Sequence, residues 1–257
     1  MATPLKVFIT GASSGIGEAL AARYARAGAT LGLCARRLEP MQALATKLGG
    51  QSACYRADVT DPACVQTAAR DFIGRFGVPD IVIANAGISI GTLTEDPGDI
   101  AAFRKVMDTN VLGMVATFQP FVAPMRERRS GTLAGIASVA GIRGLPGAGA
   151  YSASKAAAIS YLESLRAELH GSGVAVVTVC PGYIRTPMTA VNRYPMPFIL
   201  EADDAAQRIA RLIAKKRRFA VVPWQMAIVA FLLRRLPGWL YDRLFARAPR
   251  KSRNLPL

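Results

Sequence analysis

Short apolar runs alternate with longer amphipathic stretches along most of the chain. The runs have the length of β-strands, and the stretches between them have the length of helices. Several runs, such as residues 7–9 and 81–83, are apolar without alternation, which is typical of strands covered on both faces. The seven runs that we interpret as strands are residues 6–10, 29–34, 52–56, 80–84, 132–137, 174–179 and 219–222. This order predicts an α/β fold, a doubly wound parallel sheet of seven strands with helices on both faces.

The length and composition of the chain bear on its domain organisation. A chain of 257 residues, of which 51% are hydrophobic, can bury one sizeable core and lies within the size range of a single α/β domain. The sequence shows no internal repeat, and its composition first changes near residue 215. We predict one α/β domain over residues 1–222 and a helical extension over residues 223–257, packed on the same domain or on a membrane surface.

The positive charge is concentrated near the end of the chain. The formal net charge is +15 at pH 7, and residues 208–257 hold thirteen Lys and Arg against one acid, Asp242. That segment therefore carries +12, which leaves only +3 for residues 1–207. A nucleic-acid-binding protein would need a reading motif or a basic groove studded with aromatic residues, and the sequence shows neither. We therefore expect no nucleic-acid partner.

The cysteines and the first residues bear on metal binding and on compartment. Cys34, Cys54, Cys64 and Cys180 show no CxxC spacing, and the lone His170 has no other ligands clustered around it. This pattern predicts neither a metal site nor a disulfide framework. The first ten residues carry one lysine and run directly into a strand-like segment, so we expect no signal peptide. We predict a cytoplasmic protein.

A glycine-rich loop joins the first predicted strand to the helical pattern that follows it. Three glycines after Thr10 are spaced at i, i+4 and i+6. Such a turn points backbone N–H groups and a helix N-terminus at a pyrophosphate, and the missing side chains let the backbone approach closely. A tight strand-to-helix turn is the alternative, but the elements on either side favour a ligand. The residues predicted to bind a cofactor here are Gly11, Ser13, Ser14, Gly15, Ile16 and Gly17.

The residues after the second predicted strand indicate which dinucleotide is bound. An NAD enzyme presents an acid at this point to the 2′-hydroxyl of the adenosine ribose, but this chain has Ala35, Arg36 and Arg37. Guanidinium groups instead match the oxygens of a 2′-phosphate, so the sequence favours NADP(H) as the cofactor. Two solvated arginines at the start of a helix are the alternative interpretation.

Tyr151 and Lys155 open a predicted helix and lie one turn apart on the same face. A phenol with a pKa of about 10 is a poor acid or base near neutrality. A nearby ammonium favours the phenolate and is expected to lower the pKa of the phenol toward a working range. The same lysine can reach the ribose hydroxyls of a nicotinamide nucleotide. A Tyr-x-x-x-Lys pair alone is common on helix faces, so its meaning depends on the residues around it.

Further polar residues follow the ends of later strands, where open α/β sheets bind their ligands. Ser138 ends the fifth predicted strand, thirteen residues before Tyr151. Asn110 lies in a predicted helical stretch over residues 103–111, where it could also be an ordinary satisfied polar residue. The turns after the fourth and sixth strands supply Asn85, Ala86, Gly87, Pro181, Gly182, Ile184 and Thr186.

In this order and at these strand ends, the residues closely resemble the short-chain dehydrogenase/reductase family over roughly residues 5–222. The glycine spacing matches the TGxxxGxG pattern of that family, and the fold it implies is a Rossmann-type sheet. The resemblance implies that Tyr151 is the general acid in reduction and that Lys155 is its pKa-lowering partner. It further implies that Ser138 orients the substrate carbonyl and that Asn110 anchors a water-linked proton relay.

The resemblance also implies a set of cofactor contacts outside the glycine-rich loop. Asp58 resembles an adenine-contacting aspartate, although an Asp at a strand end equally well caps the residues from Thr60 onward. Asn85 and Gly87 resemble a motif that stabilises the central sheet, and Thr186 resembles a contact to the nicotinamide carboxamide. The full set is Arg36, Arg37, Asp58, Val59, Asn85, Ala86, Gly87, Tyr151, Lys155, Pro181, Gly182, Ile184 and Thr186.

A hydrophobic and basic segment follows the last predicted strand. Residues 219–233 are fifteen residues without charge, bracketed by four basic residues before and two arginines after. The run is too short to span a bilayer, which needs about 20 apolar residues. The tryptophans and arginines of the two short helices predicted over residues 224–247 are typical of interfacial segments, so contact with the cytoplasmic face of a membrane through residues 215–250 is one interpretation. The other is that these helices cover the substrate pocket or a subunit interface.

These observations favour an NADPH-dependent oxidoreductase that interconverts a carbonyl and a primary or secondary alcohol. The loop over residues 188–200 carries an apolar lining, so we expect a lipophilic substrate such as a keto-lipid, a retinoid or a steroid. The resemblance further implies a homodimer or homotetramer. The alternative is a non-catalytic NADP-binding regulatory or scaffold protein, and the intact Ser, Tyr, Lys and Asn set argues against it. The lining residues are Tyr194, Met196, Phe198 and Ile199.

Overall fold

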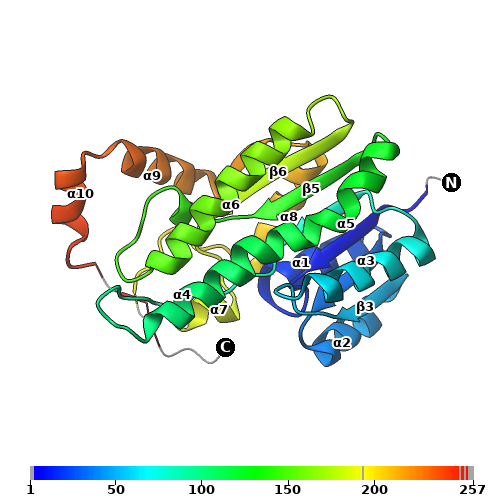
Figure 1. Cartoon of the computed structure of the whole chain (residues 1–257), viewed down its shortest axis with the longest axis horizontal. Helices are drawn as coiled ribbons and strands as arrows, with labels where there is room; N and C mark the ends of the chain where they lie inside the picture. Colours follow the sequence, from blue (N-terminus) through cyan, green and yellow to red (C-terminus); the bar gives the residue numbers. More distant parts are fainter. Residues whose placement is uncertain (1–2, 193, 249, 252, 254–257) are drawn as a thin grey trace.

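The computed structural model describes residues 3–192, 194–248, 250–251 and 253. Its strands form one seven-stranded sheet in the order β3-β2-β1-β4-β5-β6-β7. Every neighbouring pair is parallel, and helices lie on both faces of the sheet (Figure 1). The predicted doubly wound α/β fold is therefore confirmed. The strands are β1 (Lys6–Thr10), β2 (Thr30–Ala35), β3 (Ser52–Arg56), β4 (Ile81–Ala84), β5 (Gly131–Ile136), β6 (Val174–Pro181) and β7 (Phe219–Val222).

Each predicted strand is present, and its ends lie within two residues of the prediction. Ala29 and Asp80 lie just before β2 and β4, while β6 continues two residues farther than predicted, to Pro181. Every residue of β2, β4 and β5 is buried. Burial on both faces explains why these strands lack the alternation of a half-exposed sheet.

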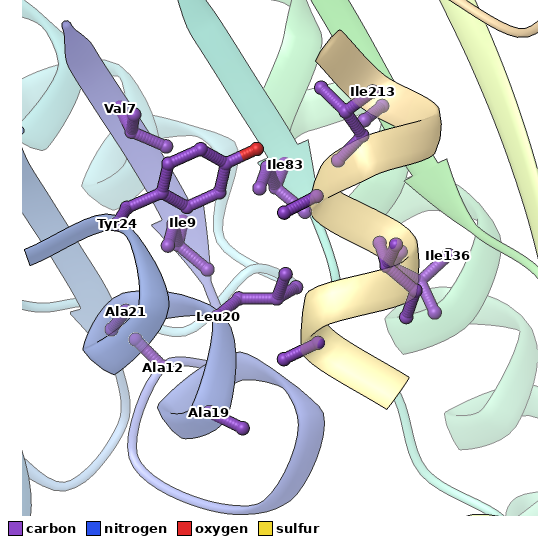
Figure 2. Packing of buried hydrophobic residues seen from close by; sticks show 14 of the residues in the cluster. Val7, Ile9, Ala12, Ala19, Leu20, Ala21, Tyr24, Ile83, Ile136 and Ile213 are labelled. Carbon is purple, nitrogen blue, oxygen red and sulfur yellow. The ribbon is translucent and has the colours of Figure 1, made fainter. Parts of the chain in front are cut away.

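The helices cover the sheet in two layers, each with its own core cluster. Helices α1, α2 and α8 pack on one face, and α3, α5 and α6 pack on the other. On the first face, Leu20 and Tyr24 of α1 and Ile213 of α8 pack against Ile9 and Ile83 of the sheet (Figure 2). The bounds are α1 (Gly15–Ala25), α2 (Leu38–Leu48), α3 (Pro62–Phe76), α4 (Asp99–Met107), α5 (Gly113–Glu127), α6 (Gly149–Glu168), α7 (Pro187–Ala190), α8 (Ala202–Ala214), α9 (Trp224–Arg235) and α10 (Gly238–Phe245), with a short 3-10 turn η2 (Val139–Gly141).

The strand order reverses between β1 and β4. The chain runs from β1 outward through β2 to β3 and then returns to β4 on the other side of β1. Connections on either side of such a reversal diverge, so a crevice opens outside the carboxyl ends of the two strands. Those ends are Thr10 in β1 and Ala84 in β4.

The helical stretch predicted over residues 103–111 is not one regular helix. α4 ends at Met107, α5 begins at Gly113, and the residues between them form a π-helical turn, η1 (Asp108–Leu112). A π-helical turn holds an extra residue, so it rotates the side chains beyond it relative to those before it. Here it contains Asn110, whose side chain is fully buried.

Helices α9 and α10, which we call the C-terminal arm, extend from the end of the molecule opposite the N-terminus (Figure 1). The arm rests on the loop between η2 and α6. Arg143 of that loop donates to the carbonyl oxygens of Arg234 and Leu236 at 3.5 and 3.3 Å. The hydroxyl of Tyr241 in turn donates to the carbonyl oxygen of Gly144. No helix within the described part of the chain is long and apolar enough to cross a membrane.

Candidate active site

A cleft of about 490 Å³ lies at the carboxyl edge of the sheet, where the strand order reverses. Its walls come from the loops after five of the strands, from the end of β5 and from the start of α6. The lining residues are Gly11, Ser13, Ser14, Gly15, Ile16, Ala35, Arg36, Arg37, Ala57, Asp58, Val59, Asn85, Ala86, Gly87, Ile88, Thr109, Ile136, Ala137, Tyr151, Lys155, Pro181, Gly182, Ile184, Thr186, Pro187, Met188 and Thr189.

The loop over residues 10–17, the glycine loop, closes tightly against itself and against the end of β4. Gly11 has a φ of +67°, and a Cβ there would lie 2.8 Å from the Cα of Ala86. A Cβ at Gly17 would lie 2.2 Å from the carbonyl oxygen of Gly11. Ser14, the N-cap of α1, makes no side-chain capping bond. The first N–H groups of α1 therefore remain available to an anion in the cleft.

Asn85 fastens the glycine loop to the sheet. Its Nδ2 donates to the carbonyl oxygens of Thr10 and Gly11, both at 3.1 Å. The backbone N–H groups of Asn85 and Ala86 donate to the hydroxyl oxygen of Thr10 at 3.3 and 3.4 Å. These four bonds join the carboxyl ends of β1 and β4, so the side chains of Asn85 and Thr10 together hold the two walls of the crevice.

Two arginines after β2 present their side chains to the cleft. Arg36 and Arg37 both line it and are both exposed. Neither forms an ion pair with another described residue. On the loop after β3, Asp58 Oδ1 accepts bonds from the N–H and the hydroxyl of Thr60 at 2.9 and 2.8 Å. Asp58 therefore makes the local cap that the sequence left open, and it also lines the cleft.

Tyr151 and Lys155 lie one turn apart near the start of α6, and both line the cleft. The Nζ of Lys155 lies 5.8 Å from the centroid of the Tyr151 ring. It donates to the carbonyl oxygen of Ile136, at the end of β5, at 2.8 Å. Ser138, two residues later, is buried, and its Oγ accepts from the N–H of Ala140 at 3.1 Å. The end of β5 and the start of α6 thus bring these polar side chains together.

Burial governs the protonation of this group. It raises the pKa of Tyr151, and the hydrogen bond of the phenol with Ser138 acts in the opposite direction with a smaller effect. Burial also lowers the pKa of Lys155 to about 8. The lowered phenol pKa expected from the sequence is therefore wrong, because desolvation disfavours the phenolate more than its surroundings favour it. At neutral pH a protonated phenol lies beside a largely protonated amine.

Asn110 lies behind the cleft lining, and its side-chain amide is committed to other groups. Its Oδ1 accepts from the N–H of Ile88 at 2.8 Å, and its Nδ2 donates to the carbonyl oxygen of Ile88 and to the Oγ of Ser154, both at 2.9 Å. A Cβ at Gly87 would lie 3.1 Å from Asn110 Oδ1 and 3.6 Å from Lys155 Nζ. The π-helical turn thus holds the loop after β4 against α6, beside the lysine.

The turn after β6 closes the cleft from the side opposite β2. Thr186 is the N-cap of α7, and its N–H donates to the Oγ1 of Thr189 at 3.0 Å. A Cβ at Gly15 would lie 3.1 Å from the Cγ2 of Thr186. The turn after β6 therefore faces the glycine loop at close range, and both segments contribute to the same cleft.

The structure brings together nearly all of the residues singled out in the sequence. Gly17, Ser138 and Asn110 are not among the residues that line the cleft, and neither are the four residues predicted to line the substrate loop, Tyr194, Met196, Phe198 and Ile199. Lining residues that were not predicted to bind the cofactor are Ala35, Ala57, Ile88, Thr109, Ile136, Ala137, Pro187, Met188 and Thr189, of which the last two begin the predicted substrate loop. Four of these, Ala35, Ala57, Ile136 and Ala137, lie at or next to strand ends that were already identified, so their position was a usable signal.

The arrangement defines a class of protein. A parallel sheet that reverses beside a glycine loop at a helix N-terminus is the architecture of dinucleotide-binding enzymes. A tyrosine and a lysine in the same cleft add a group that can transfer a proton. Fold and site together therefore indicate an α/β oxidoreductase that uses a nicotinamide dinucleotide.

Comparison with known proteins identifies the family. The family model described as short chain dehydrogenase matches residues 6–196. An uncharacterized oxidoreductase of Myxococcus xanthus (strain DK1622) is 38% identical, with 91% of this chain and 93% of the relative covered. Dehydrogenase/reductase SDR family member 7B of Mus musculus is 32% identical, with 96% of this chain and 82% of the relative covered. The crystal structure of levodione reductase is similar with a TM-score of 0.80 at 28% identity, with 88% of this chain and 99% of that chain covered.

The chain belongs to the short-chain dehydrogenase/reductase family. Members of this family are oxidoreductases that use nicotinamide cofactors. The match ends at residue 196, so the family model does not extend to the C-terminal arm.

Proposed function

We propose that this protein is an NADPH-dependent reductase that converts the carbonyl group of a lipophilic ketone or aldehyde to an alcohol, in a reversible reaction. The observation that carries the proposal is the Tyr151 phenol in the cleft beside Lys155, together with the buried hydroxyl of Ser138, which acts on the pKa of that phenol. A general acid must keep its proton until the substrate oxygen gains negative charge, and the raised pKa of Tyr151 keeps the phenol protonated at neutral pH.

The cleft fits a nicotinamide dinucleotide. The glycine loop leaves no room for a Cβ at Gly11 or Gly17, and it turns free N–H groups of α1 toward the position that a pyrophosphate would take. Lys155 and Thr186 line the other end of the cleft and would face the nicotinamide half. When bound there, NADPH supplies the hydride for the reaction.

The arginines after β2 favour NADPH over NADH. Arg36 and Arg37 line the cleft without an ion-pair partner among the described residues, and the position that holds an acid in NAD enzymes is Ala35 or Arg36 here. A 2′-phosphate would therefore meet two guanidinium groups and no opposing carboxylate. The alternative is that both arginines are simply solvated. In that case the protein would bind NADPH and NADH equally well.

Four side chains have different roles in the proposed proton transfer. The Oγ of Ser138 accepts from the N–H of Ala140, donates a long bond, 3.5 Å, to the carbonyl oxygen of Pro181, and also interacts with the Tyr151 phenol, so it is placed to orient a substrate oxygen at that phenol. Tyr151 gives its proton to the same oxygen. The Lys155 ammonium then stabilises the phenolate that remains. Asn110 keeps Gly87, Ile88 and α6 in position through its three hydrogen bonds.

The substrate side is largely apolar and aromatic. Met188 lines the cleft and is 38% exposed. The rings of Tyr183 and Tyr194 lie edge to face with centroids 6.3 Å apart. Phe198 is 49% exposed and faces solvent rather than a packed interior. Apolar and aromatic side chains in the turn after β6 support a lipophilic carbonyl substrate.

We also propose that the C-terminal arm lies on an anionic membrane surface. On α9, Trp224, Ile228, Phe231 and Leu232 are exposed and fall at i, i+4, i+7 and i+8, which places them on one helix face. Trp239 of α10 is 70% exposed. The segment from residue 208 onward carries a charge of +12, which complements anionic lipid. An apolar face with basic flanks is the composition of a helix that lies in a bilayer interface.

The reductase proposal is tested by following the oxidation of NADPH and of NADH against ketones and aldehydes graded by chain length. We expect NADPH to be the better cofactor and the specificity constant kcat/KM to rise with chain length. Rates that stay at the substrate-free background across the panel would refute the proposal and favour a non-catalytic NADP-binding protein. Equal use of the two cofactors would refute the role assigned to Arg36 and Arg37.

A further inference from the structure

Three residues near the end of the chain fold back across the substrate side of the site. We call residues 250, 251 and 253 the C-terminal strap. Arg250 lies against Gly147, in the loop before α6, where an added Cβ would come within 2.8 Å of the Arg250 Cβ. Arg253 forms ion pairs with Asp96 and Asp99, the latter with 2.9 Å between Nε and Oδ2. The strap thus bridges the loop before α6 and the start of α4.

The two segments that the strap bridges already meet beneath it. The N–H of Thr92 donates to the carbonyl oxygen of Gly147 at 3.1 Å, and Thr92 forms an isolated parallel bridge with Ala148. The Oγ1 of Thr92 also accepts from the N–H of Ala150, one residue before the catalytic tyrosine. The strap therefore rests on a platform that is hydrogen-bonded to the start of α6.

The middle residue of the strap reaches Tyr151. The Nζ of Lys251 lies 5.8 Å from the centroid of the Tyr151 ring, the same distance as the Nζ of Lys155. The two amines come from different elements. Lys155 belongs to α6 and lines the cofactor cleft, whereas Lys251 belongs to the strap and is not part of that lining. The phenol therefore has a second ammonium group close to it, outside the cofactor cleft.

Lys251 is half-buried and has no acidic partner in the described part of the chain. Its amine forms neither an ion pair nor a hydrogen bond there, and the two carboxylates beneath the strap are both taken by Arg253. Burial lowers the pKa of Lys251 to about 8, which leaves the amine mostly charged at neutral pH. A cation that is partly removed from water and lacks a counterion is a favourable site for an anion.

We infer that Lys251 is a specificity-determining residue that binds an anionic group, a carboxylate or a phosphate, on the carbonyl substrate. This inference rests on the proposed reductase function, because the anion is placed by a carbonyl held at Tyr151. The cofactor phosphates are not the anion in question, since Lys251 does not line the cleft that the dinucleotide occupies. The apolar loop over residues 188–200 and the ammonium together fit an amphiphilic substrate, a keto acid or a keto phosphate with a hydrocarbon chain.

The first test compares charged and neutral substrates of equal length. Straight-chain keto acids, their methyl esters and the matching keto phosphates are assayed with NADPH for wild type, Lys251→Met, Lys251→Arg and the control Lys215→Met, which removes an exposed charge on the surface after α8. We expect wild type to prefer an anion over the ester by about ten- to a hundredfold in kcat/KM. Lys251→Met should lose that preference, Lys251→Arg should keep part of it, and Lys215→Met should keep all of it.

The outcomes separate this inference from the proposed function. If wild type reduces the esters but shows no preference for an acid or a phosphate, the reductase function stands and the role of Lys251 is wrong. If Lys251→Met lowers kcat/KM equally for charged and neutral substrates, the residue acts on the structure of the site and not on specificity. Preference for the acid alone or the phosphate alone identifies which anion the site takes.

A second measurement does not depend on turnover. Acetic anhydride acetylates neutral amines, so the Lys251 amine, with a pKa of about 8, should react readily near that pH. Peptide mass spectrometry with NADPH present measures the rate at Lys251 with and without a keto acid, a keto phosphate or a methyl ester. Protection of Lys251 by an anion but not by the ester supports the inference. Equal labelling in all samples overturns it, even if no carbonyl compound is reduced.

Discussion

The glycine loop and the C-terminal strap both approach the same site, but different kinds of contact hold them in place. The glycine loop is shaped by backbone: Gly11 and Gly17 admit no Cβ, and Asn85 binds main-chain carbonyl oxygens. The strap is held by side chains, above all by the ion pairs of Arg253 with residues more than 150 positions away. Steric constraints between neighbouring residues therefore shape the glycine loop, whereas ion pairs between residues far apart in the chain hold the strap.

This difference determines which substitutions each region tolerates. A backbone-built loop presents N–H groups to any dinucleotide and tolerates few substitutions, so it suits the part of the reaction that all family members share. Exposed ion pairs contribute little to stability, so residues that form them can vary without unfolding the domain. We therefore expect changes at the glycine loop to abolish activity and changes at the arm and strap to redirect it.

The largest expected effect separates the chemical step from cofactor binding in the cleft. Tyr151→Phe removes the transferable proton but keeps the ring, so kcat should fall by about 10³- to 10⁴-fold. The dissociation constant for NADPH, measured by fluorescence titration, should stay close to that of wild type. If Tyr151→Phe keeps kcat within about tenfold of wild type, Tyr151 is not the proton donor.

The next effect tests whether the glycine loop is constrained by sterics. A Cβ at Gly17 would lie 2.2 Å from a carbonyl oxygen, so Gly17→Ala should destabilise the fold by about 3 kcal/mol and weaken NADPH binding about a hundredfold. Gly74→Ala is the matched control, because a Cβ at that helical position meets nothing within 4 Å. It should raise the free energy of unfolding by about 0.5–1 kcal/mol. Equal effects of the two substitutions in urea unfolding would contradict the steric argument.

A smaller effect tests which dinucleotide the cleft selects. Arg36→Ala should raise the dissociation constant for NADPH by roughly ten- to a hundredfold, the loss of one charged hydrogen-bond partner, and barely change that for NADH. Arg26→Ala, an exposed arginine at the C-cap of α1, serves as the control. Isothermal titration with both cofactors gives the answer. Equal weakening of NADPH and NADH would show that Arg36 does not read the 2′-phosphate.

Substitutions in the C-terminal arm should weaken membrane binding modestly and leave cofactor binding unchanged. Replacing Trp224 and Trp239 with Ala should weaken binding to anionic liposomes about tenfold, because both indoles lose apolar burial in the interface. Added salt should weaken the wild-type interaction but leave a residual part that depends on these tryptophans. Leu5→Ala removes an exposed apolar side chain elsewhere and should change nothing. Wild-type protein that fails to float with anionic liposomes at low salt would exclude the membrane proposal.

The smallest expected effect lies in the core between α1, α8 and the sheet. The hydroxyl of Tyr24 is buried without a hydrogen-bond partner among the described residues, and burial raises the pKa of this phenol (Figure 2). Tyr24→Phe should therefore raise the free energy of unfolding by about 1 kcal/mol. Tyr55→Phe is the control, because the Tyr55 hydroxyl donates to Asp71 at 2.7 Å and its removal should give no gain. A lower melting temperature for Tyr24→Phe would indicate an unseen partner for the hydroxyl.

The comparison also explains how much the sequence could predict. The strands and the glycine loop leave local signals, since apolar runs and glycine spacing are set by neighbours along the chain. About two thirds of the residues that line the cleft could therefore be predicted. Asn110 was placed correctly in a helical stretch, but the π-helical turn around it was not foreseen because a single extra residue barely alters the apolar periodicity.

The strap could not be predicted for a related reason. Lys251 and Arg253 belong to a basic segment whose composition resembles an ordinary solvated end, and nothing local indicates that it returns to Tyr151. The direction of the phenol pKa was also wrong, because a lysine one helical turn away is visible in sequence whereas burial is not. In both cases the missing information is three-dimensional, arising from residues far apart in the chain.

The strand order determines which half of the cleft is complete first while the chain is being synthesised. β1 pairs with β2 and β4, and β4 begins 75 residues after β1 begins, from Lys6 to Ile81. At 5–20 residues per second the ribosome needs roughly 4–15 s to add them, during which one edge of β1 stays open. The glycine loop, Arg36, Asp58 and Asn85 all precede residue 88, whereas Tyr151 follows it by 63 residues. A nascent chain should therefore complete the adenosine and pyrophosphate end of its cleft well before it contains the tyrosine that does the chemistry.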